Sequence, residues 1–368
     1  MNKKEAKKTL LICARARFDA RAPGSESFLL LFFKKEALPF PFAAPDNPPM
    51  RTLIIDTDTA SDDAIALIMA LRTPDVRIEA ITIVSGNVDV GQGAINAGIV
   101  LDLCGARVPV YRGADRPLLK PRADAGYFHG ADGLSDVGFP PPTHQAEPEP
   151  AVFELIRRCR TTPGTIDLVT LGPLTNIALA LRIEPQLATW VRSCTIMGGN
   201  PGSIGNVTPA AEYNIWCDPE AAAIVLASGM PITLVGWDLS RGAACLDAND
   251  MARLTTSHHA TARFAMACSR AALRAATATQ AEPGLPLPDP VAMAVALDPS
   301  IVTHTTRCGV AIPLDGLARG ATLIDELGTT GQHANDPAWA HTPPPIDVCR
   351  SIDIARFKSM LFRTLEQD

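Results

Sequence analysis

Two patterns of hydrophobic and polar positions alternate along most of the chain. From Leu53 onward, short apolar runs rich in β-branched residues are separated by longer stretches rich in Ala and Leu. The short runs predict strands at 53–56, 78–84, 166–170, 190–197 and 232–235. The longer stretches predict helices at 61–71, 91–104, 174–181, 219–228, 260–281 and 291–297. Strands that alternate with helices are typical of βαβ units, whose strands run parallel. We therefore expect one Rossmann-like α/β domain over residues 50–368, with a mostly parallel central sheet flanked by helices.

The first 49 residues have a different composition from the rest. They hold six of the eight lysines and six of the twelve phenylalanines, and they end in a Pro-rich tract at 39–49. The apolar run at 28–33 is short and far from the basic start, which argues against a secretory signal. We expect residues 1–49 to be an extension outside the core, an upstream translated or disordered segment, with the functional chain starting near Met50.

Composition excludes several classes of protein. The net charge is -6, and nothing in the sequence suggests the basic stripe that a nucleic-acid partner would need. The nine cysteines are scattered without a C-x-x-C pair, so neither a zinc knuckle nor a disulfide framework is indicated. No apolar run approaches the roughly 20 residues that span a bilayer. We expect a cytoplasmic protein without a membrane partner.

A group of four carboxylates follows the first predicted strand. Asp56, Asp58, Asp62 and Asp63 fall in L-I-I-D-T-D-T-A-S-D-D, where the strand ends and a helix begins. Ligands bind at the carboxyl ends of strands in such sheets. Like charges this close repel one another, although a helix N-terminus and a hard divalent cation would relieve the repulsion. Simple helix capping by Ser61 or Asp62 is an alternative, but capping needs only one or two such residues.

A second enzyme class has a similar start. Haloacid-dehalogenase-type phosphatases resemble this chain in their D-x-D-x-T motif after a hydrophobic strand. Here Ala60 stands at the fifth position, and no later Gly-Asp-x-x-x-Asp supplies the second half of a magnesium site. We therefore disfavour this class.

Further polar residues follow the later strands. Asn87 lies in a Ser-Gly-Asn turn, and the Gly-Pro pair after Leu171 can aim a backbone carbonyl into a site. Glu212 and Asn214 are two residues apart, so in an extended segment they face the same way. Together with Asn206 they suit a polyhydroxylated ligand.

Two more positions carry chemistry without a clear assignment from the sequence. Asp289 opens an apolar helix, where an N-cap and a distant metal carboxylate are equally good interpretations. His129 lies in a Gly-rich loop, where a lone histidine is more often simply exposed.

Together these residues resemble the inosine–uridine-type nucleoside hydrolase family. Its D-x-D-x-x-x-D-D signature is matched by the four carboxylates, and the run 205–214 keeps the family's spacing of Asn, Glu and Asn. L-G-P-L-T-N-I-A and H-G-x-D-G-L also match, and the resemblance extends from about Leu53 to the end of the chain. It implies Ca²⁺-dependent hydrolysis of the N-glycosidic bond of ribonucleosides to free base and ribose, for nucleoside salvage. It also implies a homodimer or homotetramer.

The resemblance also implies a role for each residue of the site. Asp58, Asp63, Asp289 and the backbone carbonyl of Leu171 would bind Ca²⁺, with Asp58 as the general base that activates a metal-bound water. Asp62 and Asn214 would hold the ribose 2′- and 3′-hydroxyls, and Asn206 and Glu212 the 5′-hydroxyl. The remaining assignments are Asn87 in the ribose pocket and Asp56 as a carboxylate that supports the others.

The chain departs from the family at the residue before the last metal aspartate. Many members have a His there that protonates the departing base, and another branch has Trp, but this chain has Pro288. His129 is one substitute acid, and Trp237 or Tyr213 could contribute to the base site. The preferred base stays open. Alternatives are a hydrolase of another N-riboside and a catalytically impaired Ca²⁺-dependent ribonucleoside-binding protein.

Overall fold

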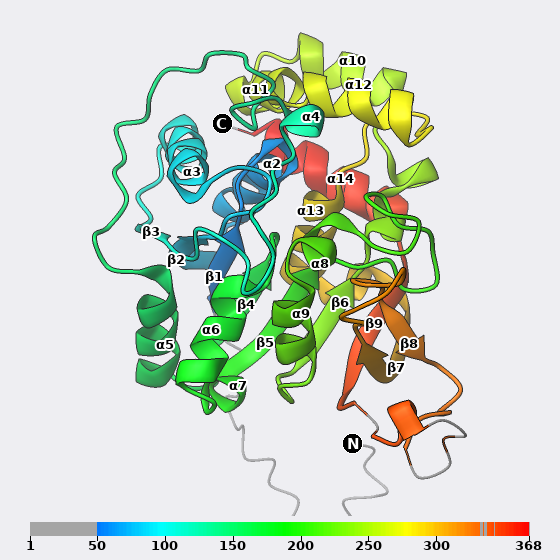
Figure 1. Cartoon of the computed structure of the whole chain (residues 1–368). Coiled ribbons are helices and arrows are strands. Elements are labelled where there is room, and N and C mark those ends of the chain that lie inside the picture. Colours follow the sequence, from blue (N-terminus) through cyan, green and yellow to red (C-terminus); the bar gives the residue numbers. More distant parts are fainter. Residues whose placement is uncertain (1–49, 332–333, 335–336, 342, 368) are drawn as a thin grey trace, which may run out of the picture. The chain divides into compact units, whose positions relative to one another are not determined.

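A nine-stranded sheet forms the centre of the part of the chain that the structure describes, in the order β3-β2-β1-β4-β5-β6-β9-β7-β8 (Figure 1). The structure is a computed structural model, and it describes residues 50–331, 334, 337–341 and 343–367. The expectation for residues 1–49 therefore lies outside the described residues. The strands are β1 (Arg51–Thr57), β2 (Val76–Ile83), β3 (Val110–Arg112), β4 (Ile166–Thr170), β5 (Val191–Met197), β6 (Ile232–Val235), β7 (Val302–Ala311), β8 (Leu323–Asp325) and β9 (Pro345–Ile352).

The sheet is mostly parallel, as predicted. The seven neighbouring strands β3, β2, β1, β4, β5, β6 and β9 pair in parallel. Strand β7 pairs antiparallel with both β8 and β9. The first six strands have the 3-2-1-4-5-6 order of doubly wound folds, whose chain reverses its direction of progress between β1 and β4. The crevice at the carboxyl ends of these two strands is therefore the expected ligand site.

Alternate residues of the strands face two hydrophobic cores. In β1, Leu53 and Ile55 face one core and Ile54 faces the other, and all three are fully buried. The first core is covered by α2 (Ser61–Leu71), α3 (Val90–Cys104), α10 (Ala248–Thr256), α11 (Ala260–Cys268), α12 (Arg270–Thr279), α13 (Pro288–Leu297) and α14 (Ile354–Leu365). The second is covered by α5 (Ala151–Thr161), α6 (Thr175–Ile183), α7 (Leu187–Trp190) and α9 (Pro219–Leu226). Burial on both faces explains why these strands are almost continuously apolar.

Helix α2 carries two of the site's carboxylates at its start. It covers residues 61–71, as predicted, and every residue from Ser61 to Ala70 is buried. Neither Ser61 nor Asp62 caps it. The Asp63 carboxylate reaches back and accepts a hydrogen bond from the Ala60 N–H at 2.9 Å. The Asp63 carboxylate thus lies at the N-terminus of a buried helix, where the helix dipole favours negative charge.

The longest predicted helix is wrong in its extent. The helix predicted at 260–281 is two helices, α11 (Ala260–Cys268) and α12 (Arg270–Thr279), which are separated by Ser269. Ser135 explains the break, because its hydroxyl donates to the Cys268 carbonyl at 2.5 Å and accepts from the Ala271 N–H at 2.9 Å. These two bonds replace helical ones at the junction. Among the residues described, no helix has both the length and the apolar character needed to cross a bilayer.

Candidate active site

The crevice beyond β1 and β4 holds a concave pocket, the kind of site that small-molecule ligands occupy. It brings together most of the residues that the sequence singled out. These lining residues are Asp62, Asn87, His129, Leu171, Asn206, Glu212, Tyr213, Asn214, Trp237, Pro288 and Asp289. Asp56, Asp58 and Asp63 do not line it and are fully buried.

Three carboxylates form a compact cluster at the pocket. Asp62, Asp63 and Asp289 each have an oxygen within 4.8 Å of the others, although Asp289 comes from a distant helix, α13. Burial, followed by the charges of Asp62 and Asp63, raises the pKa of Asp289 well above its ordinary range. Burial also raises the pKa of Asp62 to about 6. Oxygens that share one Ca²⁺ at about 2.3–2.6 Å lie at most about 5 Å apart, so the cluster fits such an ion.

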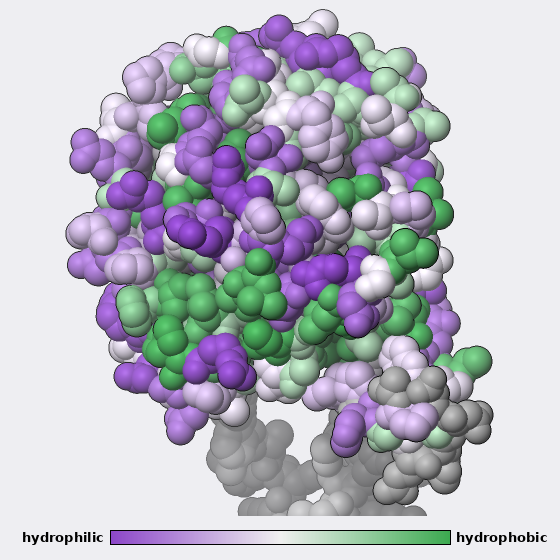
Figure 2. All heavy atoms as spheres, viewed as in Figure 1, coloured by the Kyte–Doolittle hydropathy of each residue, from purple (hydrophilic) through white to green (hydrophobic). Residues whose placement is uncertain are grey.

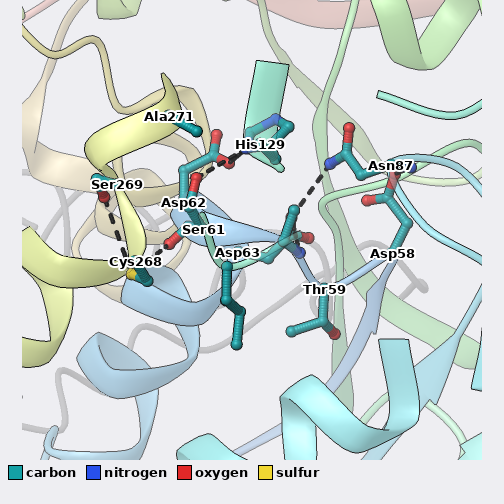
Figure 3. A network of polar contacts seen from close by, with 12 residues as sticks. Asp58, Thr59, Ser61, Asp62, Asp63, Asn87, His129, Cys268, Ser269 and Ala271 are labelled. Carbon is teal, nitrogen blue, oxygen red and sulfur yellow. Dashed lines mark hydrogen bonds and ion pairs between the residues drawn. The ribbon is translucent and has the colours of Figure 1, made fainter. Parts of the chain in front are cut away.

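Asp58 lies beside this cluster but is not one of the three. Its Oδ2 accepts a hydrogen bond from the Asn87 N–H at 2.5 Å, and its buried Oδ1 has no partner among the described residues. The Asn87 side chain reaches Asp63 at 3.4 Å, so Asn87 bridges the two aspartates (Figure 3). Burial, then the charge of Asp63, raises the pKa of Asp58 well above its ordinary range.

Two glycines make room for the Asp58 carboxylate. A Cβ at Gly86 would lie 2.1 Å from Asp58 Oδ2, and one at Gly172 would lie 2.7 Å from Oδ1. No side chain fits at either position without moving the carboxylate. The sequence marked both residues only as parts of turns, because a close approach between distant segments leaves no local pattern.

Asp56 and Leu171 occupy supporting positions at the ends of β1 and β4. Asp56 Oδ2 accepts hydrogen bonds from Thr82 Oγ1 at 2.5 Å and Asn176 Nδ2 at 2.8 Å. Burial raises the pKa of Asp56 to about 7. The Leu171 carbonyl accepts a bond from Asn214 Nδ2 at 2.7 Å, which leaves its second lone pair for another ligand.

Glu212 and Asn214 do not lie in an extended segment, so that expectation is wrong. Glu212 is the N-cap of a short helix, α8 (Tyr213–Cys217), and its carboxylate accepts from the backbone N–H groups of Asn214 at 2.9 Å and Ile215 at 3.2 Å. A third bond comes from the Gly199 N–H at 2.8 Å. Burial raises the pKa of Glu212 to about 7. Both side chains still line the pocket, as does Asn206, whose buried Oδ1 has no partner among the described residues.

His129 is buried, not exposed as a lone loop histidine usually is. It ends the short helix α4 (Gly126–His129), and its Nδ1 lies 2.7 Å from Ser61 Oγ and 3.9 Å from Asp62 Oδ1 (Figure 3). Burial lowers the pKa of His129 to about 4, so the ring is neutral at pH 7. To protonate a departing base, His129 would need a higher pKa in the substrate complex than in the free protein. The sequence analysis missed Ser61 as its partner.

Much of the remaining pocket wall is apolar. It includes Phe128, Val207, Ala272 and the segment 285–288, with Tyr127 and Gln280 as polar members that the sequence analysis missed. Trp237 is buried, and the Arg241 guanidinium lies 4.4 Å from its ring centroid. A polar floor with an apolar wall suits a ligand that has a hydroxylated part and a flat aromatic part.

Comparisons with known proteins find relatives over most of the chain. The sequence model described as inosine-uridine preferring nucleoside hydrolase matches residues 53–359. The pyrimidine-specific ribonucleoside hydrolase RihB of Escherichia coli is 35% identical over 286 residues, which cover 77% of this chain and 90% of the relative.

Solved structures match over a similar length. A plant nucleoside hydrolase, PpNRh1, superposes with a TM-score of 0.81 at 32% identity and covers 87% of this chain and 100% of its own. A purine-preferring ribonucleoside hydrolase from Gardnerella vaginalis gives a TM-score of 0.76 at 30% identity and covers 86% and 98%. An inosine-guanosine nucleoside hydrolase gives 0.77 at 35% identity, with the same coverage.

Proposed function

The chain belongs to the inosine-uridine preferring nucleoside hydrolase family, whose members are N-glycosyl hydrolases, and we propose that it hydrolyses ribonucleosides to free base and ribose with the help of Ca²⁺. The observation that carries this proposal is the buried carboxylate cluster within a pocket that also holds amide and carboxylate groups. Uncompensated carboxylates at this depth repel one another, and a cation removes that repulsion.

The proposed ion site uses Asp63 and Asp289, with Asp58 and the Leu171 carbonyl beside them. When bound, Ca²⁺ would supply positive charge that acidifies a nearby water and holds ribose hydroxyls. Asp58 would take the proton from the attacking water on Oδ1, the oxygen without a partner. Asn87 would keep the other oxygen in place through its N–H. Asp56 would support the group from the end of β1.

The proposed ribose site explains why so many polar groups converge here. Asp62 and Asn214 would hold the 2′- and 3′-hydroxyls, and Asn206 and Glu212 the 5′-hydroxyl. Binding all three hydroxyls turns binding energy into orientation of the scissile bond. The bond breaks through an oxocarbenium-like state, as in glycoside hydrolysis, and buried carboxylates near the ring stabilise that positive charge.

The base site would lie against the apolar wall. There Trp237 would stack on the base, and His129 would protonate it. The names of the relatives point to pyrimidines in one case and to purines or inosine and guanosine in others, so they assign no single base. Pro288 lines the pocket where many members have His, and it offers no proton. Cytoplasmic location, a role in salvage and a homodimer or homotetramer complete the proposal.

The test is ribose release from inosine, adenosine, uridine, cytidine and p-nitrophenyl riboside, each with Ca²⁺ and with a chelator. We expect chelator-sensitive release from at least one natural nucleoside and from the nitrophenyl compound, whose leaving group needs no proton. Release from the nitrophenyl compound alone would favour a hydrolase of another N-riboside. Tight nucleoside binding without release would favour the binding protein instead.

Cation binding should also be visible in stability. Asp62 and Asp56 have folded pKa values of about 6 and about 7, above the ordinary value of 3.8. A raised carboxyl pKa means that stability falls as pH rises from about 4 to about 7, because the folded state resists losing these protons. Ca²⁺ should therefore raise the melting temperature more at pH 7.5 than at pH 4.5. An equal shift at both values, in matched buffers with Mg²⁺ and K⁺ as controls, would contradict a carboxylate site.

A further inference from the structure

One peptide group, between Gly86 and Asn87, lies between Asp58 and a tyrosine of the pocket. Its carbonyl oxygen accepts a hydrogen bond from the Tyr213 hydroxyl at 3.1 Å, and its N–H donates to Asp58 Oδ2 at 2.5 Å. The peptide unit is planar, so its C=O and N–H point in opposite directions. A hydrogen bond that fixes the carbonyl therefore also fixes the N–H group that donates to Asp58.

This peptide needs such a partner because of the glycine. Gly86 must lack a Cβ, which would collide with Asp58 Oδ2, and a glycine backbone rotates more freely than any other. The other bonds of the turn act on the neighbouring peptides: Gly86 N–H donates to the Val88 carbonyl at 3.1 Å, and the Asn87 carbonyl accepts from Ala125 N–H at 3.0 Å. Tyr213 and Asp58 are the only hydrogen-bond partners of this peptide among the described residues.

Tyr213 is well suited to hold it. The side chain is 8% exposed and packs in a small cluster with Ala125 and Cys217, with its ring 6.1 Å from that of Trp216. Burial raises the pKa of Tyr213 far above its ordinary value, so the hydroxyl keeps its proton and donates. The ring is thus a fixed support, and the hydroxyl is its one polar contact with the 85–88 turn.

We propose that Tyr213 is a positioning residue for the hydrolysis. Its hydroxyl fixes the peptide between residues 86 and 87, so that Asn87 N–H holds one oxygen of Asp58 and leaves the other free to receive a proton. Tyr213 lies between Glu212 and Asn214, in the segment proposed to bind ribose. It therefore connects that segment with the general base, Asp58. This inference rests on the proposed role of Asp58.

The test compares Tyr213→Phe with Tyr111→Phe. Both changes remove only a hydroxyl from a buried ring, but Tyr111 lies on β3, outside the pocket, and accepts its bond from Arg158 Nη2 at 3.2 Å. We expect Tyr213→Phe to lower kcat about tenfold with KM within about twofold, and Tyr111→Phe to leave both unchanged. In an Asp58→Asn background, Tyr213→Phe should cause no further loss, because the two residues act as one unit.

Several results would overturn the inference. One is an unchanged kcat in Tyr213→Phe. Another is a raised KM at constant kcat in that variant, which would mean that the hydroxyl contacts the substrate. A third is an equal loss of kcat in Tyr111→Phe. Crystal structures of the wild type and Tyr213→Phe give a readout independent of turnover. A longer Asn87 N to Asp58 Oδ2 distance or a turned peptide supports the inference, and an unmoved peptide overturns it. Should the wild type release no ribose from any riboside, the proposed function fails, and these structures alone decide the inference.

Discussion

Replacing Asp58 with Asn should lower kcat by roughly 10²–10⁴-fold, the range that a general base contributes. The amide has the shape of the carboxylate and can still accept the hydrogen bond from Asn87 N–H. It cannot take a proton, and its NH₂ group would occupy the position of the free Oδ1. Turnover of p-nitrophenyl riboside at saturating Ca²⁺ measures the loss without the complication of the leaving-group acid.

The matched control is Asp75→Asn, the same change at an exposed position between α2 and β2. It should leave kcat unchanged. The stabilisation of Asp58→Asn by Ca²⁺ should be measured in parallel, since a variant that no longer binds the ion would lose activity for a different reason. Near-normal turnover in Asp58→Asn would refute its role as the base.

A 2′-deoxyribonucleoside should react about 10⁴-fold more slowly in kcat/KM than its ribonucleoside. A site built to bind a hydroxyl discriminates this strongly, because the missing group leaves buried polar atoms without partners. Here those atoms would be the Asp62 carboxylate, whose Oδ1 is already buried without a hydrogen bond, and the Asn214 amide.

The Asp62→Ala variant tests whether Asp62 causes the difference in rate between the ribo and 2′-deoxy substrates. In Asp62→Ala the partner of the 2′-hydroxyl is gone from the protein as well, so the two substrates should differ much less than in the wild type. The 5′-deoxyribonucleoside serves as the control substrate, because its discrimination should survive the Asp62 change. Rates within tenfold for the ribo and 2′-deoxy substrates of the wild type would remove Asp62 and Asn214 from the proposed ribose site.

The sequence predicted the parallel part of the fold well because its signals are local. Strands β4 and β6 and helix α2 have the predicted bounds, since each combines a clear apolar run with a Gly, Pro or Asp boundary. Strands β7, β8 and β9 and the short parallel strand β3 were not predicted. β7 is largely exposed in its first half and carries Thr, His and Arg there, so it lacks the apolar run of a central strand.

The polar site was predicted in its residues more than in its geometry. The four aspartates after β1 formed a visible motif, but only the fold shows that Asp289 joins Asp62 and Asp63. Glu212 was expected in an extended segment, and it caps α8 although Glu is not among the residues usually found at an N-cap. The Ser61–His129 contact joins two segments far apart in sequence and has no local signature.

The molecular surface also has an apolar region. Figure 2 shows hydrophobic residues gathered over the side of the molecule where α6 and α9 lie in Figure 1. Ile183, at the end of α6, is 55% exposed. Contiguous apolar patches on a protein surface can mark sites of association.

The division of the pocket between chain segments bears on how such enzymes diverge. Most of the apolar wall comes from 125–128 and from the stretch 269–288, whereas the carboxylates of Asp58, Asp62 and Asp63 lie on a single short segment after β1. Mutations in the wall away from Asp289 and His129 can therefore accumulate without disturbing the carboxylates of this segment. A change of preferred nucleobase then requires no change in the groups proposed to cleave the bond. Relatives that are about equally identical to this chain indeed carry the names of different bases.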